Sequence, residues 1–267
     1  MKDYILRALP DNCTWRDTVY WFETIDSTNT NAKELAAKGA PHGTVVIANQ
    51  QTAGRGRLGR SFHSPPGKGI YLSVILRPDC TARQLMHLTC AVAVAACNAI
   101  EQVTSLRPGI KWINDLVVDR KKLGGVLTEL SIDPGTQCVQ YAIIGIGINC
   151  IHAKEDFPAE IQDMATSLLL TTGKVPDLAT LAAALVHALW EMDRSLMTDT
   201  ANLMAQYRQI CITLGQPIVV LSGDTRRYGK ALDIGDDGSL YVEYDDGSTQ
   251  WVCSGEVSIR GMYGYSS

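Results

Sequence analysis

The amino-acid sequence predicts an α+β fold, with a mixed β-sheet and flanking helices followed by a small C-terminal β-barrel. Helix-like and strand-like segments succeed one another without the strict alternation that a doubly wound fold requires. After Leu214-Gly215 the pattern changes to short strands separated by Gly- and Asp-rich turns. We therefore expect two domains in the 267 residues, at 1–213 and 214–267.

The first half of the chain predicts three strands and two helices. Apolar, β-branched runs that are typical of strands occur at 19–22, 44–50 and 69–76. Cap residues at 26–29 begin a helix that we expect to end near Lys38, because Gly39 is a suitable C-terminal stop. Residues 81–84 fit a capping box and precede a long helix over 85–103. This second helix is apolar on most sides, so it is expected to be buried.

The second half predicts three more strands, two helices and the barrel. The strands are expected at 110–119, 122–131 and 139–148. An irregular stretch at 151–167 leads to a helix capped by Asp177 and to a second helix over 202–211. The barrel strands are expected at 218–221, 229–234, 239–244 and 250–252, with hairpin turns at 235–238 and 245–248.

Composition and charge argue against several classes of protein. A net charge of −4 gives no sign of a general affinity for nucleic acids or membranes. The eight cysteines are scattered without a C-x-x-C pair or a zinc spacing, which is typical of free thiols in a reducing compartment. The first residues lack the apolar core of a signal peptide, and no segment predicts a transmembrane span. A cytoplasmic protein is expected.

Residues 51–60, Gln-Thr-Ala-Gly-Arg-Gly-Arg-Leu-Gly-Arg, form the most informative segment. Glycines allow close backbone approach and arginines supply forked donors, so we expect a loop that closes on a small carboxylate or phosphate. Gly54, Gly56 and Gly59 also fit G-x-G-x-x-G, but Pro65-Pro66 and a strand follow where a dinucleotide fold needs a helix. The alternative to an anion-binding loop is a basic surface turn.

Two further segments carry lysines beside residues suited to a phosphate or a metal. In an extended strand, Lys111, Ile113 and Asp115 share one face, where the lysine and the carboxylate either hold a phosphate with its Mg²⁺ or form an ion pair. Lys122 runs into Gly124-Gly125, a pattern typical of a solvated hairpin tip or of an inward lysine with a ligand against the backbone.

Glycines alternate with isoleucines at Gly145-Ile146-Gly147-Ile148-Asn149, so one face of this strand carries no side chains. Glycine in a strand often marks close approach by a ligand or by another backbone. Tight packing of a helix on the sheet is the alternative.

The order and spacing of these segments resemble the biotin protein ligases, the family of biotin–[acetyl-CoA-carboxylase] ligases. The residues that carry the resemblance are Asp26-Ser27-Thr28-Asn29, the G-R-G-R-x-G-R run at 54–60, the K-W-x-N-D run at 111–115, Lys122 to Gly125 and Gly145 to Asn149. The resemblance extends over essentially the whole chain. It implies a class II synthetase-like catalytic fold shared by biotin and lipoate ligases, with an SH3-like C-terminal barrel. Only 26 residues precede Ser27, so the monofunctional type without an N-terminal DNA-binding domain is expected.

The resemblance implies an enzyme that activates biotin with ATP to biotinyl-5′-AMP and then transfers biotin to a lysine of a biotin carboxyl carrier domain. ATP and Mg²⁺ would be required, and a loop over 53–63 would be mobile without ligands and ordered with them. Binding to DNA or to a membrane is not expected. The sequence leaves the oligomeric state open, with a homodimer compatible with the family, and Arg260 is a candidate nucleotide contact.

The resemblance also assigns roles to individual side chains. Catalytic roles fall to Lys122, Arg55, Arg57 and Lys111, with Lys122 between the biotin carboxylate and the α-phosphate. Biotin would be bound by Ser27, Thr28, Asn29, Gln51, Gly54, Arg55, Gly56, Arg57, Lys122, Gly124, Gly125 and Gly147. ATP would be bound by Arg57, Arg60, Lys111, Asn114, Asp115, Lys122, Asn149 and Ala165. Asp115 would be the ligand of Mg²⁺.

Three other functions compete with this interpretation. A lipoate or octanoate ligase or transferase of the same superfamily is the nearest, and the G-R-G-R-x-G-R run favours biotin over it. The acidic net charge disfavours a regulatory module that binds nucleic acid. The presence of every motif lysine and arginine disfavours a biotin-binding scaffold without catalysis.

Overall fold

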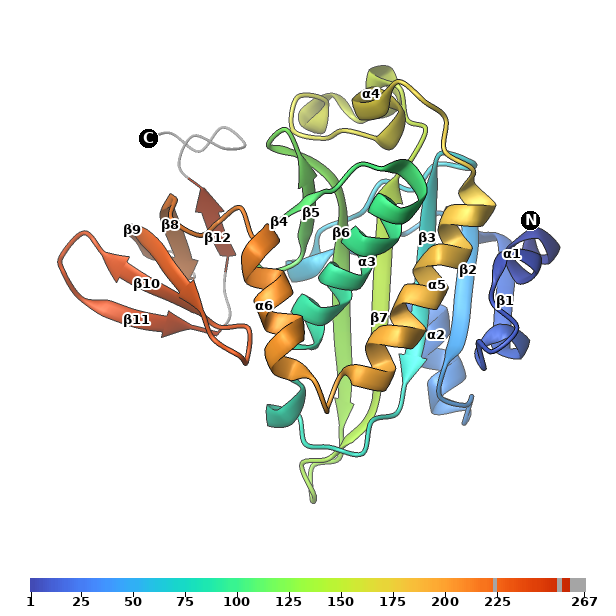
Figure 1. Ribbon diagram of the computed structural model, residues 1–267, viewed down its shortest axis with the longest axis horizontal. Coiled ribbons are helices and arrows are strands. Elements are labelled where there is room, and N and C mark those ends of the chain that lie inside the picture. Colours follow the sequence, from blue (N-terminus) through green and yellow to red (C-terminus); the bar gives the residue numbers. More distant parts are fainter. Residues whose placement is uncertain (223–224, 254–255, 260–267) are drawn as a thin grey trace.

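A seven-stranded mixed sheet forms the centre of the molecule (Figure 1). The computed structural model describes residues 1–222, 225–253 and 256–259, so Arg260 lies outside the described residues. The strand order is β1 (Val19–Ile25), β2 (Thr44–Gln51), β3 (Gly69–Leu76), β7 (Val139–Asn149), β6 (Lys121–Ile132), β5 (Asp115–Val118) and β4 (Gly109–Lys111). β1 and β2 are parallel and the other neighbours are antiparallel, which confirms the predicted mixed sheet.

Helices cover both faces of this sheet (Figure 1). One face carries α3 (Leu88–Thr104), α5 (Leu178–Ser195) and α6 (Thr200–Ile210), and α1 (Lys2–Ala8) packs against α5. The other face carries α2 (Thr28–Ala37), whose Ala32 and Ala36 pack on strand residues such as Val46. A further short helix is α4 (Leu168–Thr172), and single 3₁₀ turns lie at η1 (Arg16–Thr18), η2 (Arg57–Gly59), η3 (Arg83–Leu85), η4 (Lys154–Asp156) and η5 (Ala159–Ile161).

The predicted strand at 110–119 is interrupted, and this corrects the sequence interpretation. Residues 112–114 form a turn with a cis peptide bond between Trp112 and Ile113, so Ile113 does not share an extended strand with its neighbours. Lys111 and Asp115 instead pair directly across the β4–β5 hairpin. Cross-strand partners point to the same face of a sheet, so the two side chains still face the same way.

The long apolar helix begins later than predicted. Gln84 accepts hydrogen bonds from the Thr81 N–H and hydroxyl, both at 2.9 Å, but η3 intervenes before α3 starts at Leu88. The stretch Arg83–Thr104 is long and apolar enough, by length and composition, to cross a membrane. Within this fold 67% of an 18-residue window of this stretch is buried, as in a core helix, and α3 packs against the sheet, α5 and α6.

The C-terminal part forms a separate five-stranded antiparallel sheet in the order β11 (Thr249–Val252), β10 (Leu240–Tyr244), β9 (Thr225–Ile234), β8 (Pro217–Ser222) and β12 (Glu256–Ile259). The sequence had not separated β12 as a strand. The hairpin turn between β9 and β10 docks on the first part of the chain, because the Trp112 Nε1–H donates to the Gly238 carbonyl at 2.9 Å. Arg208 on α6 holds the same turn by donating to the Ile234 carbonyl at 2.6 Å and to Asp236 at 2.5 Å.

Candidate active site

A cavity lies on the α2 face of the sheet, beyond the first turn of that helix. Its floor is built from small residues on β6 and β7, where Gly125 pairs with Gly147 and Leu127 pairs with Gly145. A Cβ on Gly145 would lie 2.0 Å from Asn29 Oδ1, and a Cβ on Gly147 would lie 2.5 Å from the Phe62 ring. The side-chain-free face of β7 therefore gives room to these two side chains, which form walls of the cavity.

One end of the cavity is a closed polar network. The Thr28 N–H and hydroxyl donate to Gln51 Oε1 at 2.8 and 3.1 Å, and Gln51 Nε2 donates to the Ser64 hydroxyl at 2.9 Å. Ser73 on β3 connects this group to Asn29, with 2.8 Å to the Thr28 hydroxyl and 2.6 Å to Asn29 Oδ1. These side chains are fixed by their partners, and buried polar networks of this kind specify one geometry.

The first turn of α2 is capped in a way that the sequence did not predict. Ser27 occupies the N-cap position but its hydroxyl makes no capping hydrogen bond. The Gln51 side chain, from a neighbouring strand, takes the Thr28 N–H instead. Ser27 lines the cavity, so its hydroxyl, which can donate and accept, is available to a ligand there.

Glu129 on β6 gathers donors from two other elements beside this polar end. Asn29 Nδ2 donates to Glu129 Oε2 at 2.9 Å, and Lys33 of α2 pairs with Oε1. Arg55 Nη2 lies 3.3 Å from the same Oε1. Burial alone would raise the pKa of the Glu129 carboxyl, but the hydrogen bonds from Lys33 and Asn29 outweigh it and hold the pKa below its usual value. The charge of Arg55 is thereby offset by an ionised partner.

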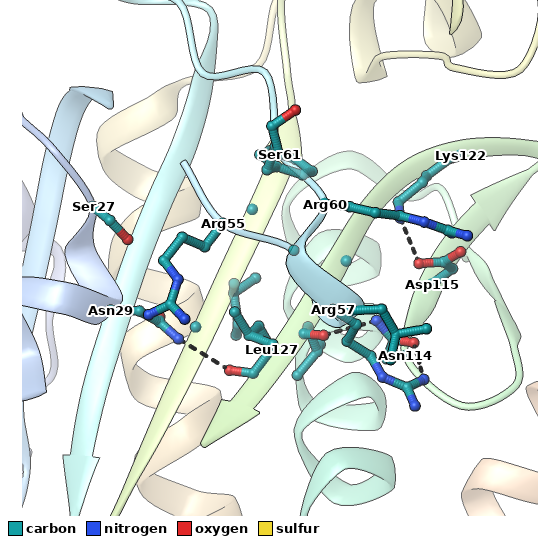
Figure 2. A pocket seen from close by; sticks show the side chains of 18 of the residues that line it. Ser27, Asn29, Arg55, Arg57, Arg60, Ser61, Asn114, Asp115, Lys122 and Leu127 are labelled. Atoms are coloured by element: carbon teal, nitrogen blue, oxygen red, sulfur yellow. Dashed lines mark hydrogen bonds and ion pairs between the residues drawn. The ribbon is translucent and has the colours of Figure 1, made fainter. Parts of the chain in front are cut away.

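The opposite end of the cavity is rich in cations. Figure 2 shows Ser27, Asn29 and Arg55 on one side, Arg60, Asp115 and Lys122 on the other, and Leu127 between them. Lys122 Nζ donates to Asp115 Oδ1 at 2.6 Å. The 112–114 turn is held in place by reciprocal hydrogen bonds between Asn114 and the Val126 backbone. Arg57 Nη1 donates to Asn114 Oδ1 at 3.0 Å, which ties the arginine loop (residues 53–63) to this turn.

A second cavity adjoins the first at this cationic end. Lys122 forms a backbone bridge with the irregular segment, since its N–H donates to the Met164 carbonyl at 2.7 Å and its carbonyl accepts from the Thr166 N–H at 2.9 Å. Asn149 Nδ2 donates to the Thr166 carbonyl at 3.1 Å on the other side. The walls are mainly apolar and come from Phe157, Ile161, Met164 and Ala165.

The two cavities share one wall. Six residues line both of them, namely Arg60, Ser61, Phe62, Lys111, Asp115 and Lys122. Among the described lining residues of both cavities, Asp115 is the one acidic side chain, beside four basic residues at this end, Arg57, Arg60, Lys111 and Lys122. Two ligands in neighbouring cavities would meet at a surface that offsets negative charge.

Most of the side chains singled out in the sequence come together here. The first cavity is lined by Ser27, Thr28, Asn29, Gln51, Arg55, Gly56, Arg57, Asn114, Gly125 and Gly147, the second by Asn149 and Ala165, and both by Arg60, Lys111, Asp115 and Lys122. Gly54 and Gly124 are not among the lining residues. A Cβ on Gly54 would lie 2.4 Å from the Phe62 carbonyl oxygen, and one on Gly124 would lie 2.4 Å from the Gly147 carbonyl oxygen, so both glycines serve backbone packing.

Several lining residues had not been named individually as ligand contacts from the sequence. They are Leu58, Ser61, Phe62, Trp112, Val126, Leu127, Ile146 and Val257 in the first cavity and His63, Ile161 and Met164 in the second. Val257 comes from β12, so the C-terminal sheet contributes to the site. Period-two alternation along β6 would have placed Gly125, Leu127 and Glu129 on one face. The contribution of β12 has no local signal.

The residues at the shared wall fit a Mg²⁺ ion that arrives with a nucleotide. Among the described residues, no three His, Cys, Asp or Glu side chains gather into a metal site of their own. Mg²⁺ in nucleotide sites is usually held by one or two carboxylates together with phosphate oxygens and water. Asp115 supplies one such carboxylate on the wall of both cavities.

Comparisons with known proteins identify the family of this chain. A family model described as the Biotin/lipoate A/B protein ligase family matches residues 21–149, and one described as the Biotin protein ligase C terminal domain matches residues 213–260. The bifunctional ligase/repressor BirA of Bacillus spizizenii is 38% identical over 226 residues, which span 84% of this chain and 69% of the relative. The biotin–[acetyl-CoA-carboxylase] ligase of Mycobacterium tuberculosis is 32% identical over 237 residues, spanning 86% of this chain and 85% of the relative.

A solved structure extends this similarity to three dimensions. The biotin protein ligase of Aquifex aeolicus in complex with biotin and ATP aligns with a TM-score of 0.76 at 29% identity, covering 91% of this chain and 98% of that one. The resemblance inferred from the motifs is confirmed, and the chain belongs to the biotin protein ligase family.

Proposed function

We propose that this protein is an ATP-dependent biotin–[acetyl-CoA-carboxylase] ligase, which forms biotinyl-5′-AMP and transfers biotin to a lysine of a biotin carboxyl carrier protein. The observation that carries the proposal is the wall shared by the two cavities, with Lys122, Lys111, Arg60 and Asp115 on it. A reaction between two bound anions needs such a meeting point, and family membership supplies the identity of the two ligands.

In the first step an oxygen of the biotin carboxylate attacks the α-phosphorus of ATP, and the bond to pyrophosphate breaks. Both reactants are negative, so cationic side chains must offset their repulsion as they approach. Lys122 is our candidate for the group between them, because it lines both cavities and is held at 2.6 Å from Asp115. Arg60 and Lys111 would hold phosphate oxygens, and Arg57 would act from the arginine loop.

The polar end of the first cavity suits the neutral ureido ring of biotin. The ring presents N–H donors and a carbonyl acceptor, and Ser27, Thr28 and Gln51 supply hydroxyl and amide groups of both kinds. Glu129 offsets the charge of Arg55 beside them. This end therefore recognises by hydrogen bonding and shape, while Leu127 and the glycine floor would lie along the apolar part of the ligand.

The second cavity suits the nucleotide. Asn149 and Ala165 would face the adenosine among mainly apolar neighbours. Asp115 would hold Mg²⁺, which would supply positive charge that offsets the charge of the phosphates. Its position beside Lys122 makes this one carboxylate part of both the metal site and the positioning of the lysine.

In the second step the amine of the carrier lysine attacks the acyl carbon, and AMP leaves. An acyl-adenylate hydrolyses in water, so closure of the arginine loop over the ligands would protect it. We expect residues 53–63 to exchange backbone hydrogens more slowly once biotin and ATP are both bound. Equal exchange with and without the ligands would contradict loop closure.

The test of the proposal is the intact mass of a purified biotin carboxyl carrier domain after incubation with the protein, ATP, Mg²⁺ and biotin. One added biotin per carrier, with AMP and pyrophosphate released in equal amounts, is the expected result. Lipoate in place of biotin should give no added mass. Transfer of lipoate but not of biotin, or no transfer of either, would overturn the proposal.

A further inference from the structure

Glu129 lies outside the lining of both cavities, yet it contacts two elements that form the polar end. It stands on β6, one alternation beyond Leu127, and its side chain is 20% exposed. Asn29 and Lys33 reach it from α2, and Arg55 reaches it from the arginine loop. It is the carboxylate through which the loop is attached to the helix.

The two carboxylate oxygens of Glu129 contact different residues. Oε2 accepts from Asn29 Nδ2 at 2.9 Å, which orients an amide whose Oδ1 is already fixed by Ser73. Oε1 is shared by Lys33 and by Arg55, the latter at 3.3 Å. Lys33 does not line either cavity, whereas Arg55 and Asn29 both line the first. The Lys33 contact therefore anchors Glu129, and the other two contacts act on the cavity.

From this geometry we propose that Glu129 is a positioning residue for biotin: it holds Arg55, and with it the arginine loop, at the polar end of the cavity and keeps Asn29 in its orientation. The inference rests on the proposed function for the identity of the ligand. Arg55 accordingly acts at the polar end, as a loop anchor and cavity wall, and not at the shared wall where Lys122 stands.

The position of Glu129 also explains why a cation can be tolerated beside a neutral ring. An unpaired guanidinium at this end would attract anions, including the carboxylate of a wrongly oriented ligand. Pairing with Glu129 removes that attraction and leaves the cationic shared wall as the place where a carboxylate is stabilised. Glu129 would thereby help to set the direction in which biotin enters.

The experiment compares Glu129→Gln and Arg55→Gln, alone and together, with Lys38→Gln, an exposed lysine at the C-terminal end of α2 that lines neither cavity, as the control. For each variant, biotin affinity is measured by calorimetry, KM values for biotin and ATP by carrier biotinylation, and loop order by hydrogen–deuterium exchange of residues 53–63. We expect either single variant to weaken biotin about tenfold, the double variant to weaken it no further, and the KM for ATP to change by less than about twofold.

The exchange measurement separates this inference from the proposed function and from a general loss of stability. Faster exchange confined to 53–63 in Glu129→Gln and in Arg55→Gln, with normal exchange in Lys38→Gln and an unchanged Tm, is the expected pattern. This exchange pattern can be measured without ligands, so the test of Glu129 remains valid even if the protein does not biotinylate the carrier. Unchanged loop exchange, additive effects on biotin affinity, or equal increases in the KM for biotin and ATP would overturn the inference. Arg55 is 45% exposed, so its variant should fold even if Glu129→Gln does not.

Discussion

The two ends of the first cavity differ in charge: one is a hydrogen-bonded polar network, and the other carries an excess of basic side chains. At the polar end, Thr28, Gln51, Ser73 and Asn29 form a chain of hydrogen bonds, and Arg55, the one cation among the described lining residues there, is paired with Glu129. At the other end, the described lining residues include four basic side chains and one carboxylate. Under the proposed function, one end would recognise a neutral group by geometry, and the other would lower the energy of a reaction between anions.

The largest effect is expected at the cationic end, from Lys122→Ala. Removing this charge should lower the rate of adenylate formation by about 10²–10³-fold at saturating biotin and ATP, because the repulsion between carboxylate and phosphate is no longer offset. Lys121→Ala is the matched control, since Lys121 precedes Lys122 on β6, is exposed and lines neither cavity. Release of labelled pyrophosphate measures the rate. A similar loss in both variants would show that the effect is not local to the shared wall.

Gly145→Ala should damage the polar end alone. Its Cβ would lie 2.0 Å from Asn29 Oδ1, so Asn29 must move and lose its hydrogen bonds to Ser73 and Glu129. The loss of these two hydrogen bonds, one buried and one part-buried, predicts a loss of biotin affinity of about 10–100-fold, with little change in the KM for ATP. Gly135→Ala, in an exposed turn with a negative φ, is the control. Normal biotin affinity in Gly145→Ala would contradict a role for Asn29 in biotin binding.

Trp112→Phe tests whether the C-terminal sheet supports the cationic end. The variant leaves the Gly238 carbonyl without its indole donor, which should cost about 1–3 kcal/mol of unfolding free energy. Since Trp112 belongs to the turn between Lys111 and Asp115, we expect the KM for ATP to rise several-fold. Trp190→Phe also removes an indole hydrogen bond, to Thr14 at 3.1 Å, far from the site, and should change stability only. Equal kinetic effects in both would contradict the role of the docked hairpin.

The smallest expected effect is on the free energy of unfolding at acidic pH, and it comes from His152, which lies behind the second cavity. His152 is buried and stacked on Phe157, with ring centroids 4.8 Å apart, and its ring nitrogens have no hydrogen-bond partner. Burial, followed by the nearby His63, lowers the pKa of His152 to about 4, although Asp156 opposes this. Between pH 6.5 and about 4, His152 is therefore protonated in the unfolded chain but largely neutral in the folded chain.

This difference makes the folded state less stable as the pH falls from 6.5 towards 4, by at most about 1.4 kcal/mol per pH unit. His152→Phe should abolish this part of the acid destabilisation and preserve the stack on Phe157. Urea unfolding at pH 7 and at pH 5 measures it, with His187→Gln on α5 as the control. The same pH dependence in His152→Phe as in the unmodified protein would refute the assignment.

Local patterns in the sequence predicted the cationic end better than the polar end. Lys111, Asp115 and Lys122 stand in short runs whose residue types already indicate phosphate chemistry. Even the mistaken single strand at 110–119 placed Lys111 and Asp115 on one face, because direct partners across a hairpin also share a face. The shared face of the two side chains was therefore predicted although the local structure was wrong.

The polar end depends on contacts between distant segments, which no local pattern carries. Glu129 looks like any acidic residue on a half-exposed strand, and its contact with Arg55 depends on how the arginine loop folds back. Gln51 caps α2 only because β2 runs beside its first turn. Val257 reaches the cavity through the docking of the C-terminal sheet, a tertiary event that its own strand does not record.

The most direct test of the two-ended cavity is a crossed measurement on Lys122→Ala and Gly145→Ala. Biotin affinity without ATP is measured by calorimetry, and the rate of adenylate formation is measured at biotin concentrations that saturate each variant. We predict that Lys122→Ala keeps its biotin affinity within about tenfold but forms the adenylate much more slowly. Gly145→Ala is expected to bind biotin more weakly and to keep most of its rate of adenylate formation. Parallel loss of affinity and rate in both variants would contradict the separation of recognition from catalysis.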